Sequence, residues 1–202
     1  MRTNLEAYAT RLSDAGVRVD AVPLPVALAD GLRSWQELVL PIIGTGLPDE
    51  VYAPFAELES VLGDDPLLVS ARALSSRYRS WAGANALRQY QRRAWAELFE
   101  GYDVVLAPVM PTAAFPHDTE RDITQRVLDV DGVEVPHLVA VAWCGAIGSV
   151  LLPVVTVPTG PTPAGLPVGL QIVGPFLSDR RLLRIAAALD AAAGPGFVAP
   201  PA

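Results

Sequence analysis

The stretch LLPVVTVPTGPTPAGLPVGLQIVG, from Leu151 to Gly174, decides the fold of this chain. Two apolar runs, Val154–Val157 and Val168–Val173, flank a connection made almost entirely of Pro, Thr and Gly. Valine and isoleucine suit a pleated surface, whereas proline and glycine interrupt regular structure. The stretch therefore predicts a pair of strands, both covered on two faces because their apolar residues do not alternate with polar ones. Gly169 predicts a bulge or a close backbone approach.

The first 25 residues predict a helix followed by a strand. Tyr8 and Leu12 recur at helical spacing, and Gly16 stands where a glycine commonly ends a helix. Alternation from Val17 to Leu24 then predicts a strand, because successive strand residues point to opposite faces.

Residues 26–100 are predicted to be mostly helical. The longest helical candidate runs from Leu67 to Glu100, after an N-cap at Asp65, with Gly83 as a candidate point of division. Residues 101–193 are predicted to be a block of strands, a hairpin and helices, and residues 194–202 a frayed tail. Within that block Asp131-Gly132, between two valine-rich runs, predicts a type I′ hairpin turn.

Composition limits the class of protein. The chain has 202 residues, 22 acidic and 15 basic, and its net charge of −7 offers no electrostatic footprint for nucleic acid. The single cysteine, Cys144, excludes an internal disulfide framework and fits a reducing compartment. No apolar run reaches the roughly 18 residues of a membrane span, and the N-terminus lacks the apolar core of a signal peptide. We therefore expect a cytoplasmic protein.

All fifteen basic residues are arginine, and the chain contains no lysine. Lysine therefore cannot act in this chain as a general base, a Schiff-base former or a phosphate ligand.

The last hundred residues resemble the C-terminal part of the amidase signature family of amide hydrolases. The matching features, in chain order, are YDVVLAPVMPTAAFPHD (Tyr102–Asp118), the hairpin at Asp131-Gly132, Trp143 and Gly148 before LPVVTVPTG, GLPVGLQIVGP (Gly165–Pro175), and Asp179 at the start of a closing helix. Residues 8–25 also resemble the helix–strand unit that follows the family's catalytic half. The resemblance implies an α/β fold, the C-terminal part of a mixed-sheet α/β/α sandwich, as a single partial domain over residues 1–202.

Enzymes of that family use a Ser–Ser–Lys arrangement, in which an unprotonated lysine activates a serine through a second serine, and backbone NH groups stabilise the oxyanion. An activated hydroxyl needs a base within hydrogen-bond reach and donors aimed at the developing charge. The only adjacent serines, Ser75-Ser76, lie in a helical context without neighbouring glycines, and lysine is absent. No residue is therefore assigned a catalytic role.

Other sites are disfavoured by their surroundings. Cys144 with His117 or His137 has the residue types of a cysteine hydrolase, but its apolar neighbours favour a buried structural thiol. Ser178 is better explained as the N-cap of the closing helix. Two histidines and one cysteine at long spacing do not make a metal site, and no cofactor is predicted.

The resemblance implies that this chain shapes a substrate channel. The substrate-binding candidates are Met110, Pro111, Thr112, Phe115, Trp143, Cys144 and Ile147; the interpretation that they are ordinary core and loop residues stays open. We predict the C-terminal, channel-forming portion of an amidase, inactive alone. The alternatives are a non-catalytic small-molecule-binding or interaction module, and a subunit complemented by a separate N-terminal catalytic chain. The expected partners are a small amide and such an N-terminal chain, or a second copy paired through exposed sheet edges, but neither nucleic acid nor a membrane.

Overall fold

The computed structural model describes residues 2–58, 60–122 and 125–195. Its contacts divide the chain into two compact units that interleave in the sequence: unit 1 contains residues 1–23, 96–116 and 152–202, and unit 2 contains residues 24–95 and 117–151. The single-domain interpretation stays a prediction. Most of the expected frayed tail, residues 196–202, lies outside the described residues.

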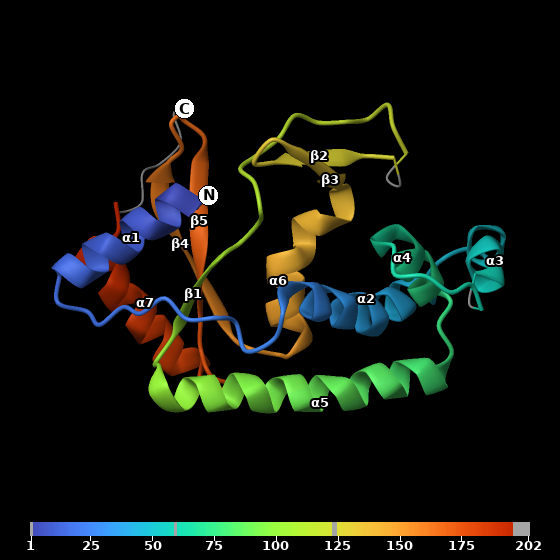
Figure 1. Cartoon of the computed structure of the whole chain (residues 1–202), viewed down its shortest axis with the longest axis horizontal. Coiled ribbons are helices and arrows are strands. Elements are labelled where there is room, and N and C mark those ends of the chain that lie inside the picture. The colour runs from blue at the N-terminus through green and yellow to red at the C-terminus, as the bar shows by residue number, and fades with distance from the viewer. Residues whose placement is uncertain (1, 59, 123–124, 196–202) are drawn as a thin grey trace. The chain divides into compact units, whose positions relative to one another are not determined.

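A three-stranded antiparallel sheet in the order β1–β5–β4 is the centre of unit 1 (Figure 1). Strand β1 is Val105–Pro108, β4 is Val154–Pro161 and β5 is Pro167–Val173. The predicted strand pair is confirmed as β4 and β5, with Val155 opposite Ile172. The expected coverage of both faces is wrong for β4, since Thr156 is exposed and Val157 is buried. Strand β4 thus has the one-sided burial common in antiparallel sheets.

Gly169 lies where β4 and β5 approach closely. The register between the strands shifts between Pro158 and Gly160, opposite Gly169, as expected for a bulge. A Cβ atom on residue 169 would lie 2.9 Å from the Val157 carbonyl oxygen and 3.0 Å from Cγ2 of Thr156. Only glycine fits at this position without moving the neighbouring strand.

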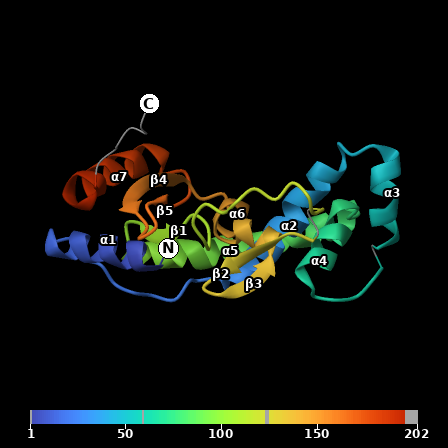
Figure 2. The same ribbon diagram turned by 90° about the horizontal axis from the view of Figure 1, so that it is seen from above.

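Helices α1 (Arg2–Asp14) and α7 (Asp179–Ala193) pack against the sheet and against each other (Figures 1 and 2). The shared core contains Tyr8, Leu12, Val157, Leu170, Ile172, Leu182, Ala186, Leu189 and Ala193. Gly16 follows α1 with a φ of 85°, which confirms the predicted C-terminal glycine. Ser178 is the N-cap residue of α7, as predicted, but its hydroxyl donates to the Pro175 carbonyl at 2.6 Å and makes no capping bond to the first turn of the helix.

The strand predicted from Val17 to Leu24 is wrong. This segment follows α1 without pairing to any strand in the described part of the chain. Val17 and Val19 nevertheless pack against the core of unit 1, while Arg18 is exposed and donates from Nη2 to the Gly101 carbonyl at 2.9 Å. The alternation therefore indicates that one side of the segment is buried. An extended segment can be buried on one side without the hydrogen-bonded neighbour that defines a strand.

In unit 2, helix α2 (Leu28–Gly44) packs against α6 (Ala142–Ser149) and α4 (Pro66–Leu74). Hydrogen bonds tie it to neighbouring helices: Gln36 Nε2 to Ser70 Oγ at 2.9 Å, Gln91 Nε2 to Ser34 Oγ at 2.8 Å, and Trp81 Nε1 to the Leu38 carbonyl at 3.0 Å. The other elements are α3 (Asp49–Glu57), β2 (Val127–Val130), β3 (Val133–Pro136), a 3₁₀-helix (His137–Val141) and α5 (Tyr78–Gly101), whose residues 96–101 belong to unit 1.

The helix predicted from Leu67 to Glu100 divides after Leu74, and the predicted division at Gly83 is wrong. The Asp65 cap is confirmed, because its carboxylate accepts from the backbone NH groups of residues 67 and 68. At the other end of α4, Ser75 Oγ donates to the Phe55 carbonyl of α3 at 2.7 Å and also contacts the Arg72 carbonyl of its own helix at 3.4 Å. A single glycine such as Gly83 weakens a helix by only about 1 kcal/mol.

The hairpin at Asp131-Gly132 is confirmed. Strands β2 and β3 pair in antiparallel register, and the two turn residues have φ values of 54° and 84°. Positive φ at both central positions defines the type I′ turn. Asp129 Oδ1 also accepts from the backbone NH of Gly132 at 2.9 Å, which stabilises the turn.

Three buried polar groups meet between α1 and α7. The Arg11 guanidinium lies over the Tyr8 ring, 5.5 Å from its centroid, and Arg11 Nε donates to the Ala193 carbonyl at 2.7 Å. The Tyr8 hydroxyl, Arg11 Nη2 and Asp190 Oδ1 are buried without a hydrogen-bond partner in the described structure. Burial raises the pKa of Tyr8, the Asp190 carboxylate raises it further, and Arg11 acts in the opposite direction.

Alkaline pH should therefore destabilise unit 1 through Tyr8. The pKa of Tyr8 is higher in the folded chain than in the unfolded chain. The neutral Tyr8 hydroxyl therefore contributes its full stabilisation below the unfolded pKa of about 10, and this stabilisation is lost as the pH rises above that pKa. We expect urea unfolding of the native chain to show a free energy that falls above about pH 10, and Tyr8→Phe to flatten this decline. Tyr90→Phe, at an exposed position, is the control. Equal pH slopes for Tyr8→Phe and the native chain would contradict the expectation.

Candidate functional site

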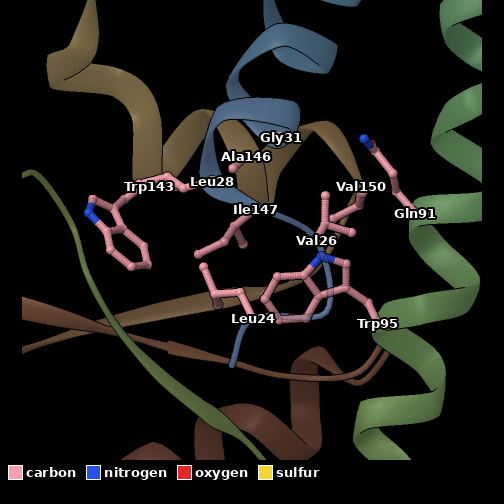
Figure 3. Close-up of a pocket in the computed structure, with 10 residues that line it drawn as sticks. All are labelled: Leu24, Val26, Leu28, Gly31, Gln91, Trp95, Trp143, Ala146, Ile147 and Val150. Atoms are coloured by element: carbon pink, nitrogen blue, oxygen red, sulfur yellow. The ribbon is translucent and has the colours of Figure 1, made fainter. Parts of the chain in front are cut away.

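An apolar pocket lies where α2, α5, α6 and the segment before α2 meet within unit 2 (Figure 3). Its lining residues are Leu24, Val26, Leu28, Gly31, Gln91, Trp95, Trp143, Ala146, Ile147 and Val150. Figure 3 shows the Trp95 indole extending from α5 toward Leu24 and Val26. The space between the side chains is only about 10 Å³, about the size that one water molecule needs. The pocket is therefore nearly closed in this structure.

Helix α6 brings two of the predicted substrate-binding residues together. Trp143 and Ile147 are four positions apart, share one helix face and both line the pocket. Cys144 lies on a different side of the helix and is exposed, so the predicted buried thiol is wrong. The apolar residues next to Cys144 in the sequence are distributed around helix α6. The described residues cover only part of the circumference of this helix, and Cys144 lies on the uncovered part.

The other predicted substrate-binding residues follow β1 in unit 1. Met110, Pro111 and Thr112 are half-buried, and Phe115 is 38% exposed. None of them lines the pocket around Trp143. The two groups of candidates belong to different compact units, so a common channel stays a prediction.

Gln91 is a pocket residue that the sequence did not single out. It is 7% exposed, and its Nε2 donates to Ser34 Oγ, but its Oε1 is buried without a partner among the described residues. A buried acceptor without a hydrogen bond costs about 1–3 kcal/mol. Ala84 and Trp95 of α5 are also buried, and Gln91 lies at helical spacing from both, on the inner face of the helix. This periodicity could have identified Gln91 from the sequence.

Two glycines allow α2 and α6 to approach closely beside the pocket. A Cβ atom on Gly31 would lie 2.5 Å from Cβ of Ala146, and one on Gly145 would lie 2.9 Å from Cγ of Trp35. These distances are shorter than van der Waals contact, so neither position accepts a larger residue without a shift of the helices.

The adjacent serines lack the surroundings of a nucleophile. Ser75 follows α4 and its Oγ donates to the Phe55 carbonyl at 2.7 Å, while the only hydrogen bond of Ser76 Oγ within the described residues is to the Arg77 carbonyl, at 3.4 Å. The described residues contain no group of three or more His, Cys, Asp or Glu side chains that could hold a metal ion. No helix in the described ranges is both long and apolar enough to cross a membrane.

A family model described as Amidase matches residues 4–183. Among curated proteins, a glutamyl-tRNA(Gln) amidotransferase subunit from Mycobacterium ulcerans is 36% identical over 132 residues, which are 64% of this chain and 25% of that protein. The corresponding subunit from Streptomyces avermitilis is 31% identical over 166 residues, 81% of this chain and 29% of that protein. The chain thus spans less than a third of the length of these relatives.

Solved structures share the fold. A bacterial aryl acylamidase of the amidase signature family superposes with a TM-score of 0.67 at 18% identity, over 95% of this chain and 40% of that one. A 6-aminohexanoate cyclic dimer hydrolase bound to its substrate gives 0.65 at 21% identity, over 95% and 41%. An inhibitor-bound chain from a vestigial protein complex, related to the origins of an s-triazine catabolic enzyme, gives 0.68 at 21%, over 94% and 38%. The predicted α/β fold class is confirmed.

The close approach of α2 and α6 predicts opposite effects for two glycine substitutions. Gly31→Ala should lower the free energy of unfolding by about 1–3 kcal/mol, because its Cβ has no room beside Ala146. Gly83→Ala, with no atom within 4 Å of the new methyl group, should raise stability by up to about 1 kcal/mol. Urea denaturation of the two variants measures the difference. An equal or greater stability of Gly31→Ala would show that the helices are not packed as described.

Proposed function

Because this chain belongs to the amidase family, we propose that it is the channel-forming, C-terminal part of an enzyme that hydrolyses a carboxylic amide C–N bond. The resemblance found in the sequence is confirmed by the match over residues 4–183. The chain spans less than a third of the length of its curated relatives. The amide substrate and the existence of a further part of the active enzyme are therefore also proposed. We also propose a cytoplasmic location and a single partial domain.

One observation carries the expectation that the chain is inactive alone. It matches the family over most of its length, yet none of its 202 residues is a lysine. Hydrolysis through a Ser–Ser–Lys arrangement needs an unprotonated amine to accept the serine proton. Arginine is not a substitute, because its guanidinium stays protonated in proteins. The base and the nucleophile must come from elsewhere in the complete enzyme.

The proposed contribution of this chain is to bind and orient the amide. We propose that Trp143 and Ile147 on α6, with Cys144 beside them, line one part of the channel. Met110, Pro111, Thr112 and Phe115, after β1, line another part. The apolar character of the pocket around Trp143 supports this role, since ligand pockets are lined mainly by apolar and aromatic groups. Its small volume requires that a bound substrate widen it or occupy a neighbouring space.

Membership of a larger assembly is the second candidate. The curated relatives are named as subunits of amidotransferases, and one structural neighbour is described as part of a protein complex. In this form a separate chain would supply the serine and lysine residues, and the present chain would complete the substrate site. Exposed apolar side chains on unit 1, such as Leu177 and Leu183, at 79% and 59% exposure, are consistent with a missing partner.

The purified chain should release no ammonia or amine from a panel of aryl and aliphatic amides. Addition of the N-terminal part of an amidase, expressed separately, should restore turnover if the two parts form the site together. Labelling of Cys144 with a maleimide provides a second measurement, because the exposed thiol should react in the native chain and become protected on assembly. Turnover by the chain alone, retained in Cys144→Ala, would overturn the proposal.

A further inference from the structure

We propose that the cleft between α2, α4 and the start of α5 binds a small zwitterion of the free α-amino acid type. The cleft lies within unit 2 and has a volume of about 230 Å³. Its lining residues are Glu37, Val69, Arg72, Ala73, Ser76 and Ser80. A cavity of roughly 150 Å³ holds benzene, so the cleft has room for an amino acid with a small apolar side chain. The proposal does not depend on the amidase role.

Arg72 supplies the positive charge of the cleft. Its Nη1 donates to the Val61 carbonyl at 2.7 Å, which fixes the guanidinium against the loop before α4. Among the described residues it makes no second hydrogen bond. A guanidinium held at one nitrogen still presents further NH donors in a fixed plane, the arrangement that binds carboxylates.

Glu37 supplies the negative charge. Its Oε1 accepts from Arg33 Nε at 3.1 Å, and Arg33 is itself held by Asp64 through a 3.0 Å contact from Nη1. These contacts orient the Glu37 side chain, which is 33% exposed. An ionised carboxylate has about four acceptor sites, so Oε2 can accept from a ligand ammonium group. Arg72 and Glu37 form no ion pair within 4.0 Å of each other in the described structure.

The remaining lining residues fit the rest of an amino acid. Val69 and Ala73 are 3% and 4% exposed, and they provide an apolar wall for a small side chain. The hydroxyl groups of Ser76 and Ser80 can each donate or accept. A simple anion would meet the Glu37 carboxylate, and a simple cation would meet Arg72. A molecule that carries both a positive and a negative charge can place each of them against a side chain of opposite charge.

L-Valine is a suitable probe, with acetate and methylamine as ligands that each carry one of its charges. We expect L-valine to shift the backbone amide signals of Ser76 and Ser80 saturably in the NMR spectrum of the full chain. Acetate and methylamine should each bind at least about tenfold more weakly, because each loses one charge-assisted contact. Glu37→Gln and Arg72→Gln should weaken L-valine binding to a similar extent. Arg79→Gln, at an exposed position outside the cleft lining, should leave the affinity unchanged.

Glu37→Gln is the decisive variant, because it keeps the size of the side chain and does not touch the Arg72–Val61 bond. Near-UV circular dichroism checks that each variant stays folded, since Arg72→Gln also removes the contact with the loop. The proposal is overturned if L-valine causes no saturable shift. It is equally overturned if acetate binds as well as L-valine, or if folded Glu37→Gln binds like the native chain.

Discussion

The burial of β5 beneath α1 and α7 is the contact on which unit 1 depends. Leu170 and Ile172 of β5 are almost completely buried, and Tyr8 from α1 and Leu182 from α7 are buried in the same core. A large apolar side chain contributes about 1.5–3 kcal/mol when fully buried. Packing of a sheet against helices is one of the conditions that make it stable in water, where an isolated hairpin is only marginally stable. Residues more than 160 positions apart therefore provide one another's hydrophobic environment.

Unit 2 depends on a different principle, the close packing of small residues along α2. At Gly31 and Gly145 no side chain separates α2 from α6. Gln36 of α2 donates to Ser70 of α4, while Ser34 and the Leu38 carbonyl of α2 accept from Gln91 and Trp81 of α5. This packing leaves a nearly closed apolar pocket and an open charged cleft. Neither is lined by a lysine, the base that the family's Ser–Ser–Lys arrangement uses. Under the proposed function, this chain binds the amide and the catalytic groups come from another part of the enzyme.

Local sequence signals predicted several local structures correctly. The β4–β5 pair, the hairpin at Asp131-Gly132 and the Asp65 cap depend on residues close together in the chain. Two of the errors concern features decided by distant neighbours. The segment from Val17 to Leu24 has the pattern of a strand but no backbone partner among the described residues, and Cys144 has apolar sequence neighbours but an exposed side chain.

For the candidate site, the family resemblance singled out Trp143, Cys144 and Ile147, and in the structure Trp143 and Ile147 line the pocket. The resemblance could not show how little space the pocket contains, because cavity volume depends on side chains from α2 and α5. Gln91 was missed although its spacing from Ala84 and Trp95 places it on the buried face of α5, and no sequence pattern indicates that its Oε1 lacks a hydrogen-bond partner.

The pairing of α1 with α7 fixes an order of events during synthesis on the ribosome. Unit 2 is complete once Leu151 has been made, whereas unit 1 must wait for α7. At about 5–20 residues per second the delay is a few seconds, during which α1 and the sheet strands have no cover and are exposed to chaperones and proteases.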